Sequence, residues 1–173
     1  RKGKVFGLEV LTYDPYIQPW IAKEYKVETV PTLEELANRS DFISMHTPLN
    51  NETRKLLGES FFKAMKRTAY FINTCRGPTV DEAALIRALQ QGEIAGAAID
   101  VFEVEPTPSD NPLLKMDNVI VTPRSAGTSS ESGPAAQVQI GQEAARVLNG
   151  MWPMSLVNPQ VRGSISTREA AMT

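Results

Sequence analysis

Short apolar runs alternate with segments of helical periodicity along the chain. Six runs have the length of buried strands, at residues 8–14, 27–30, 41–46, 69–73, 96–102 and 118–122. Nearly all of them are too continuously apolar for half-exposed antiparallel strands, in which apolar and polar residues alternate. The alternation of strands with helices is typical of βαβ units. We therefore predict a parallel sheet that helices cover on both faces.

Two of the helices have recognisable signals at their ends. Thr32 and Glu35 have the spacing of a capping box, whose two side chains satisfy free backbone N–H groups at a helix start. Asp81 is placed to cap a second helix, and Gly92 stands where a left-handed residue would end it. The apolar stripe of this second helix consists of Ala84, Leu85, Ala88 and Leu89.

The C-terminal part of the chain has a weaker helical pattern. A longer helix is expected from about residue 130 to residue 149, with Pro134 in its first turn and Gly141 weakening its interior. Residues 162–173 contain little that a fold would bury, so we expect them to form a mobile tail.

Composition and charge narrow the class of protein. The 173 residues are 42% hydrophobic and 22% charged, which is ordinary for a globular chain with one core. The net charge is −2 and lysines and arginines form no dense cluster, so we expect neither a nucleic acid nor a membrane as partner. No apolar run reaches the length of a membrane span, and the basic start lacks the apolar core of a signal peptide. These features predict a soluble, cytoplasmic protein.

Cysteine and histidine each occur once, as Cys75 and His46. A disulfide framework and a CxxC metal site are therefore excluded, and we expect no metal site. Cys75 lies beside Arg76, whose charge can activate a thiol, but the neighbouring sequence supplies no base. We prefer the interpretation that Cys75 is a small apolar filler.

Charged residues follow the first and fourth strand-like runs. Asp14 ends the first run, where a carboxylate either accepts hydrogen bonds from the ribose hydroxyls of a dinucleotide or caps the following turn. Arg76 precedes a glycine turn after the fourth run. Its guanidinium can hold a carboxylate in a bidentate fork, or it can form a surface salt bridge.

Three more charged residues lie at the last two runs. Asp100 is inside an apolar run, where its charge must either be paired or hydrogen-bond a ligand. Glu105 either orients a catalytic side chain or is solvated. Arg124 follows the abrupt end of the run at 118–122, a position where parallel-sheet proteins carry out chemistry.

Five consecutive segments resemble the NAD-binding domain of the D-isomer-specific 2-hydroxyacid dehydrogenases. They are FGLEVLTYDPY, DFISMHTPLNNETRKLL, FINTCRGPTVDEAALIRAL, IAGAAIDVFEVEP and NPLLKMDNVIVTPRSAG. The resemblance runs from about residue 3 to residue 159. It implies a Rossmann-like, doubly wound α/β fold, NAD as cofactor, and hydride transfer between NAD(H) and a small 2-hydroxy or 2-keto acid.

The resemblance assigns one group of residues to the cofactor. Asp14 would bind the adenosine ribose and favour NAD over NADP, because a 2′-phosphate would meet a negative charge. His46, Thr47 and Pro48 would form a loop against the cofactor at a strand end, with a packing role for His46.

A second group would act around the nicotinamide and the substrate. Thr74, Cys75 and Arg76 would form a turn that contacts the cofactor, and Arg76 would also grip the substrate carboxylate. Asp100 would hydrogen-bond the nicotinamide carboxamide. Glu105 would orient the catalytic histidine of the family and keep it protonatable near neutral pH.

The segment TPRSAG departs from the TPH-x-x-G motif of the family. Arg124 stands in place of the histidine that exchanges the hydroxyl proton, and Arg124 and Gly127 would still border the cofactor. A guanidinium stays protonated in proteins and cannot release a proton usefully at neutral pH. Arg124 can instead bind an oxyanion, or it can form an inert salt bridge with Glu105.

Three further features of the family have no match in this sequence. The glycine fingerprint GxGxxG and the first, central strand lie upstream of the segment that matches FGLEVLTYD, and the substrate domain is built mainly from still earlier segments. We therefore expect a partial NAD-binding domain at 1–150, a connector and tail at 151–173, and negligible turnover by the isolated chain.

The alternative is a non-catalytic association or scaffold module. In that case residues 8–14 and 41–46 would pair directly, or would pair with another chain in a homodimer or strand-exchanged oligomer.

Overall fold

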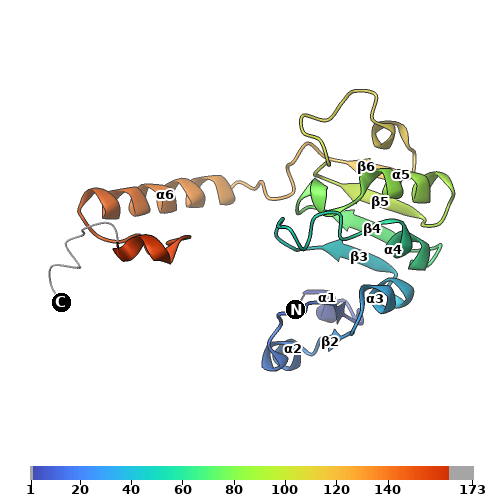
Figure 1. Cartoon of the computed structure of the whole chain (residues 1–173), viewed down its shortest axis with the longest axis horizontal. Coiled ribbons are helices and arrows are strands. Elements are labelled where there is room, and N and C mark those ends of the chain that lie inside the picture. Colours follow the sequence, from blue (N-terminus) through green and yellow to red (C-terminus); the bar gives the residue numbers. More distant parts are fainter. Residues whose placement is uncertain (1, 164–173) are drawn as a thin grey trace. The chain divides into compact units, whose positions relative to one another are not determined.

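A computed structural model describes residues 2–163 of the chain (Figure 1). The chain divides into two compact units, Arg1–Ala126 and Gly127–Thr173. The sequence-based division into functional domains at residue 150 stays a prediction.

The larger sheet of the first unit has four parallel strands in the order β3-β4-β5-β6. They are β3 (Phe42–Met45), β4 (Tyr70–Asn73), β5 (Gly96–Ile99) and β6 (Val119–Val121). Their last residues, Met45, Asn73, Ile99 and Val121, are register partners from strand to strand. The loops that follow these strands therefore begin at one common edge, and the predicted parallel α/β fold is confirmed.

A second, two-stranded parallel sheet contains β1 (Leu11–Thr12) and β2 (Glu28–Thr29). The helix α2 (Pro19–Tyr25) connects these strands, and α1 (Lys2–Val5) precedes them. All six predicted strands are thus present, although each is shorter than its apolar run. Since β1 and β3 belong to different sheets, residues 8–14 and 41–46 do not pair directly within the described chain.

The helices of the first unit cover one face of the four-stranded sheet. The helices α4 (Glu59–Ala64) and α5 (Glu82–Gln90) connect successive neighbouring strands in one direction, and right-handed crossovers then place both on the same side. The helix α3 (Leu33–Arg39) packs against α4 (Figure 1).

Residues 2–126 leave the opposite face of this sheet uncovered. Phe42, Tyr70 and Ile120 lie on it and are 64%, 45% and 70% exposed. The prediction of helices on both faces is therefore confirmed for one face, and it stays a prediction for the other, which no helix of residues 2–126 covers. The reason is the one-directional strand order from β3 to β6, which carries every intervening helix to the same side.

The core lies between the covered face and the helices. Phe62 of α4 and Phe71 of β4 are fully buried, and their rings meet edge to face with centroids 5.4 Å apart. Burial of one such side chain stabilises the fold by about 2–3 kcal/mol. Leu85 and Leu89 of α5 are buried in the same cluster, so the predicted apolar stripe of this helix is confirmed.

The predicted helix ends are confirmed, with one change. Thr32 Oγ1 accepts a hydrogen bond from Glu35 N at 3.1 Å, but the Glu35 carboxylate pairs with Arg39 instead of returning to the cap. Asp81 accepts from Ala84 N at 3.2 Å. Gly92 has a φ of 64°, as the predicted left-handed stop requires.

The second unit contains α6 (Ser132–Leu148), which has Pro134 in its first turn, and a short 3-10 helix, η3 (Pro159–Gly163). The expected helix from about 130 to 149 is confirmed. Most of the tail expected at 162–173 lies outside the described residues. None of the described helices combines the length and apolarity that crossing a bilayer requires.

Candidate functional site

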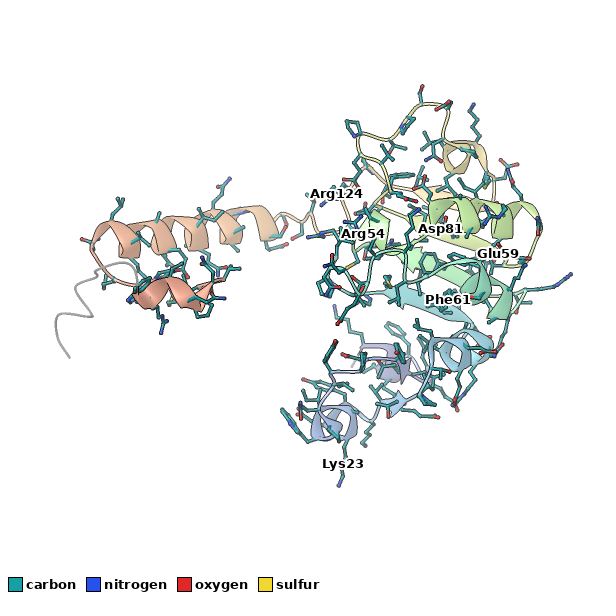
Figure 2. All side chains as sticks on the ribbon, viewed as in Figure 1. Lys23, Arg54, Glu59, Phe61, Asp81 and Arg124 are labelled. Atoms are coloured by element: carbon teal, nitrogen blue, oxygen red, sulfur yellow. The ribbon has the colours of Figure 1, made fainter. Side chains whose placement is uncertain are left out.

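The candidate site lies where the four parallel strands end. Three loops begin there, at residues 46–48 after β3, 74–76 after β4 and 122–126 after β6. The buried carboxylate of Asp100 lies at the same edge, directly after β5. Figure 2 shows Arg124 on this side of the sheet. The strand register thus brings together most residues that the sequence singled out.

Asp100 anchors the loop after β6. It is 5% exposed and accepts hydrogen bonds from Thr122 Oγ1 at 2.5 Å, Ser125 N at 2.7 Å and Ala126 N at 3.1 Å. Burial alone would raise the pKa of Asp100, but these hydrogen bonds and the nearby Arg124 charge outweigh it and lower the pKa below its usual range. Asp100 is therefore ionised at neutral pH, and the protein itself satisfies its charge.

Arg124 has a left-handed backbone, with a φ of 56°, which is uncommon for a residue with a side chain. The hydrogen bonds from Ser125 N and Ala126 N to Asp100 hold the residues immediately after it. Its Nη1 donates to Glu105 Oε1 at 3.1 Å and to Oε2 at 2.8 Å. Of the two alternatives from the sequence, the salt bridge with Glu105 is the one formed.

The ion pair is partly open to solvent. The side chains of Arg124 and Glu105 are 52% and 37% exposed, so water screens the attraction between their charges. A pair of this kind stabilises a fold by about 1 kcal/mol or less. The ion pair is more important for the chemistry of the site, because it joins the charged groups of Arg124 and Glu105 to each other.

Glu105 belongs to a loop that is fastened to α5. Its Oε1 also accepts from Phe102 N at 3.2 Å. Two residues earlier, Glu103 N donates to Glu82 Oε2 at 2.8 Å, and Glu82 N donates back to Glu103 Oε2 at 3.1 Å. These bonds fix the backbone that presents Glu105 to Arg124.

The turn after β4 is shaped by a residue that sequence reasoning missed. Asn73 is 1% exposed; its Oδ1 accepts from Cys75 N at 3.0 Å and its Nδ2 donates to Arg76 O at 3.1 Å. The signal for it was a polar residue that closes an apolar strand immediately before the turn. Thr122, which donates to Asp100, was also missed; it is the first residue after β6.

Gly77 allows this turn to pack against the neighbouring loop. A Cβ atom at Gly77 would lie 1.8 Å from Phe102 O, so only glycine permits this backbone approach. The turn with Arg76 therefore lies directly against the backbone that leads to Glu105. The Arg76 side chain is largely exposed, and its Nη1 donates to Cys75 O at 2.6 Å.

The loop after β3 is linked to this turn through the thiol. Cys75 Sγ donates to Thr47 O at 2.7 Å, and Pro48 O accepts from Thr53 Oγ1 at 2.6 Å. Thr47 Oγ1 is buried and has no hydrogen-bond partner among the described residues. His46 is exposed and shares a hydrogen bond between its Nε2 and Ser44 Oγ at 2.9 Å.

Asp14 lies at the end of β1 and is exposed. Its Oδ1 accepts from Tyr16 N at 2.9 Å, so the turn-capping interpretation is realised; the ribose interpretation stays a prediction. Tyr16 OH donates to Glu52 Oε2 at 2.8 Å, which the sequence analysis did not anticipate. Thr74 is exposed and Gly127 begins the second unit, and their roles also stay predictions.

Comparison with known proteins identifies relatives over most of the chain. The family model for the D-isomer specific 2-hydroxyacid dehydrogenase, NAD binding domain, matches residues 1–126. The "Glyoxylate reductase" of Korarchaeum cryptofilum (strain OPF8) is 44% identical over 161 residues, which are 93% of this chain and 48% of the relative. The "D-3-phosphoglycerate dehydrogenase" of Methanocaldococcus jannaschii is 42% identical over 158 residues, 91% of this chain and 30% of the relative.

Solved structures also align with most of the chain. A D-lactate dehydrogenase with NAD+ from Lactobacillus jensenii aligns with a TM-score of 0.81 at 32% identity, over 90% of this chain and 50% of that one. An acyclic imino acid reductase, Bsp5, in complex with NADPH and D-Arg aligns with a TM-score of 0.79 at 30% identity, over 91% and 48%. The chain thus spans half or less of the length of these relatives.

Proposed function

The chain belongs to the D-isomer-specific 2-hydroxyacid dehydrogenase family, and we propose that it forms part of a site for NAD and a 2-hydroxy or 2-keto acid in which proton transfer is disabled. The observation that carries this proposal is the ion pair of Arg124 with both carboxylate oxygens of Glu105 at the carboxyl edge of the sheet. In related enzymes, according to the resemblance, a histidine occupies the position of Arg124.

The residues around the sheet edge fit the cofactor. Asp14 offers an exposed carboxylate to the ribose hydroxyls, and Thr47 Oγ1 is a buried hydroxyl whose hydrogen bond a ligand can complete. We assign the loops at 46–48 and 74–76 to the remaining contacts. When bound, NAD supplies the carbon that accepts or donates the hydride.

Arg76 is the residue proposed to bind the substrate. Its exposed guanidinium offers several N–H donors in one plane, and the carboxylate of a 2-keto acid accepts two of them in parallel. Asn73 and Gly77 fix the backbone on either side of Arg76, so its side chain projects from a turn of defined conformation.

Arg124 cannot perform the proton half of the reaction. The substrate oxygen gains or loses a proton as the hydride moves, and a guanidinium, which stays protonated in proteins, does not exchange that proton at neutral pH. Arg124 can hold negative charge on that oxygen through hydrogen bonds. Glu105, which would hold a histidine in its cationic form, instead neutralises the guanidinium.

Two measurements test this proposal. In a chimaera, this chain replaces the matching part of the Korarchaeum cryptofilum glyoxylate reductase, and NADH binding and reduction of a panel of 2-keto acids are measured against the parent enzyme. We expect NADH to bind and turnover to fall by about 100-fold or more. We also expect negligible turnover from the 173-residue chain alone. Turnover equal to that of the parent would refute the disabled proton transfer, and absent NADH binding would refute the cofactor assignment.

A second candidate function is association with another chain. It is favoured by the exposed apolar residues Phe42, Tyr70 and Ile120 on one sheet face, and by the position of β3 at the sheet edge. Light scattering on the purified chain tests it. A dimer would support association, whereas a strictly monomeric, well-folded species would argue against it.

A further inference from the structure

We propose that Glu52, held in place by Tyr16, is a second determinant of the choice of NAD(H) over NADP(H), in addition to Asp14. This inference rests on the proposed function, because it requires the adenosine ribose to lie beside Asp14. The choice between the cofactors is not fixed by the fold alone, since one structural neighbour is a complex with NADPH.

A continuous chain of hydrogen bonds links the two carboxylates. Asp14 Oδ1 accepts from Tyr16 N at 2.9 Å, and Tyr16 OH donates to Glu52 Oε2 at 2.8 Å. Tyr16 and Glu52 are 36 positions apart, so the second bond joins the loop after β1 to the loop after β3. Glu52 is thereby held at the same end of the molecule as the proposed ribose acceptor.

Tyr16 is fixed at both ends although it is not buried. It is 72% exposed, and yet its backbone N–H and its hydroxyl each have a carboxylate partner. The loop of Glu52 is itself ordered, because Asn50 Oδ1 accepts from Glu52 N at 2.9 Å and from Thr53 N at 3.0 Å. The carboxylate of Glu52 therefore has a defined position in the absence of any ligand.

The phenol lies within the electrostatic field of both acids. The hydrogen bond to Glu52 raises the pKa of Tyr16 most, the Glu52 charge and slight burial raise it further, and Asp14 adds to the shift. The positive charge of Lys55, in the same loop, is directed to Glu103, which lies 2.8 Å from its Nζ. A 2′-phosphate beside Asp14 would therefore meet repulsion from the carboxylates of Asp14 and Glu52.

The expected size of the effect follows from Coulomb's law. A doubly charged phosphate about 10 Å from one carboxylate in water loses about two- to four-fold in affinity, and one at about 5 Å loses about ten-fold or more. We assign the smaller effect to Glu52 and the larger to Asp14. Both should shrink in high salt, because exposed charges are screened beyond about 10 Å.

The experiment compares NADH with NADPH, which differ only in the 2′-phosphate. Dissociation constants are measured by calorimetry for the chimaera described above and for its Asp14→Asn, Tyr16→Phe, Glu52→Gln and Tyr16→Phe/Glu52→Gln variants. Asp117→Asn is the matched control, since Asp117 is an exposed carboxylate just before β6, at the opposite edge of the sheet. Circular dichroism verifies that each variant keeps the fold.

We expect Glu52→Gln to improve NADPH binding relative to NADH by about two- to four-fold, and Asp117→Asn to leave the ratio unchanged. Tyr16→Phe should change the ratio in the same direction. The double variant should behave like Glu52→Gln alone, because Tyr16 acts on the ratio only by holding Glu52 in place. A general weakening of the fold would lower the affinity for both cofactors and leave their ratio unchanged.

The outcomes separate this inference from the proposed function. If Asp14→Asn changes the ratio and Glu52→Gln does not, Glu52 has no role and the proposed function stands. If the chimaera binds neither cofactor, or if Asp14→Asn leaves the ratio unchanged, the proposed adenosine position fails and this inference fails with it.

Discussion

Two carboxylate clusters at the strand ends are built in contrasting ways. Around Asp100, a carboxylate that is 5% exposed accepts three hydrogen bonds from the loop that carries Arg124. Around Asp14, two exposed carboxylates are joined only through Tyr16, which is itself 72% exposed. The first cluster belongs to the folded core, and the second lies on its surface.

This difference in burial determines whether a substitution in a cluster changes the stability of the fold or the binding of a ligand. A buried ionised carboxylate is costly unless its oxygens are hydrogen-bonded, so folding itself fixes the geometry around Asp100. Exposed pairs contribute about 1 kcal/mol or less, so residues at the Asp14 end can change ligand preference with little effect on the fold. Changes near Asp100 should therefore appear in stability, and changes near Asp14 in cofactor selectivity.

The largest effect on stability is expected from Gly77→Ala. Its new Cβ would lie 1.8 Å from Phe102 O, and only a backbone shift can relieve this contact. We expect a loss of about 3 kcal/mol or more in the free energy of unfolding, measured by urea denaturation. Gly58→Ala is the control, because a Cβ at Gly58 meets nothing within 4 Å. Equal stability of the two variants would contradict the close packing of the two loops.

The next largest effect is expected from Asp100→Ala. It leaves the N–H groups of Ser125 and Ala126 without their acceptor, which should lower the free energy of unfolding by about 2–3 kcal/mol. Asp117→Asn on the exposed surface should change it by less than about 0.5 kcal/mol. A loss for Asp100→Ala as small as for Asp117→Asn would show that the cluster is not part of the core.

Acid should weaken the same cluster. The folded-state pKa of Asp100 lies below its ordinary value of 3.8, so its ionised form stabilises the fold above about pH 4, and this stabilisation is lost as the pH falls through the folded-state pKa. The stability difference between wild type and Asp100→Asn should therefore shrink as the pH is lowered in urea titrations. A difference that stays constant from neutral pH to about pH 3 would contradict the assigned direction.

The smallest effect is expected from Arg124→Gly. Glycine relieves the cost of a left-handed backbone, about 1 kcal/mol, while loss of the exposed ion pair with Glu105 costs a similar amount. The free energy of unfolding should stay within about 1 kcal/mol of wild type. Arg124→Ala, which keeps the unfavourable φ, should be the less stable of the two, and the reverse order would contradict the backbone argument.

Local patterns in the sequence predicted the elements of the fold well. Thr32, Asp81 and Gly92 act through neighbours within a few positions, so their roles could be read from spacing alone. That residues 2–126 leave one face of the sheet uncovered could not be predicted in this way. Whether Phe42 and Tyr70 are covered depends on the direction of the strand order, which apolar runs do not reveal.

The candidate site was predictable in its membership but not in its contacts. The sequence singled out Asp100 inside the fifth apolar run and Glu105 and Arg124 after the last two runs, and the alternative of an Arg124–Glu105 salt bridge is confirmed. The sequence did not show that the Asp100 carboxylate accepts hydrogen bonds from the loop of Arg124. Ser125 and Ala126 donate their backbone N–H groups, which nearly every residue type possesses. The Tyr16–Glu52 bond spans 36 positions and follows only from the packing of two loops.

The most direct test of the central claim is Arg124→His in the chimaera with the glyoxylate reductase. We expect histidine beside Glu105 to restore proton transfer and to raise kcat for 2-keto acid reduction by about 100-fold or more, with little change in NADH affinity. An unchanged kcat with intact NADH binding would show that Arg124 is not what limits the reaction.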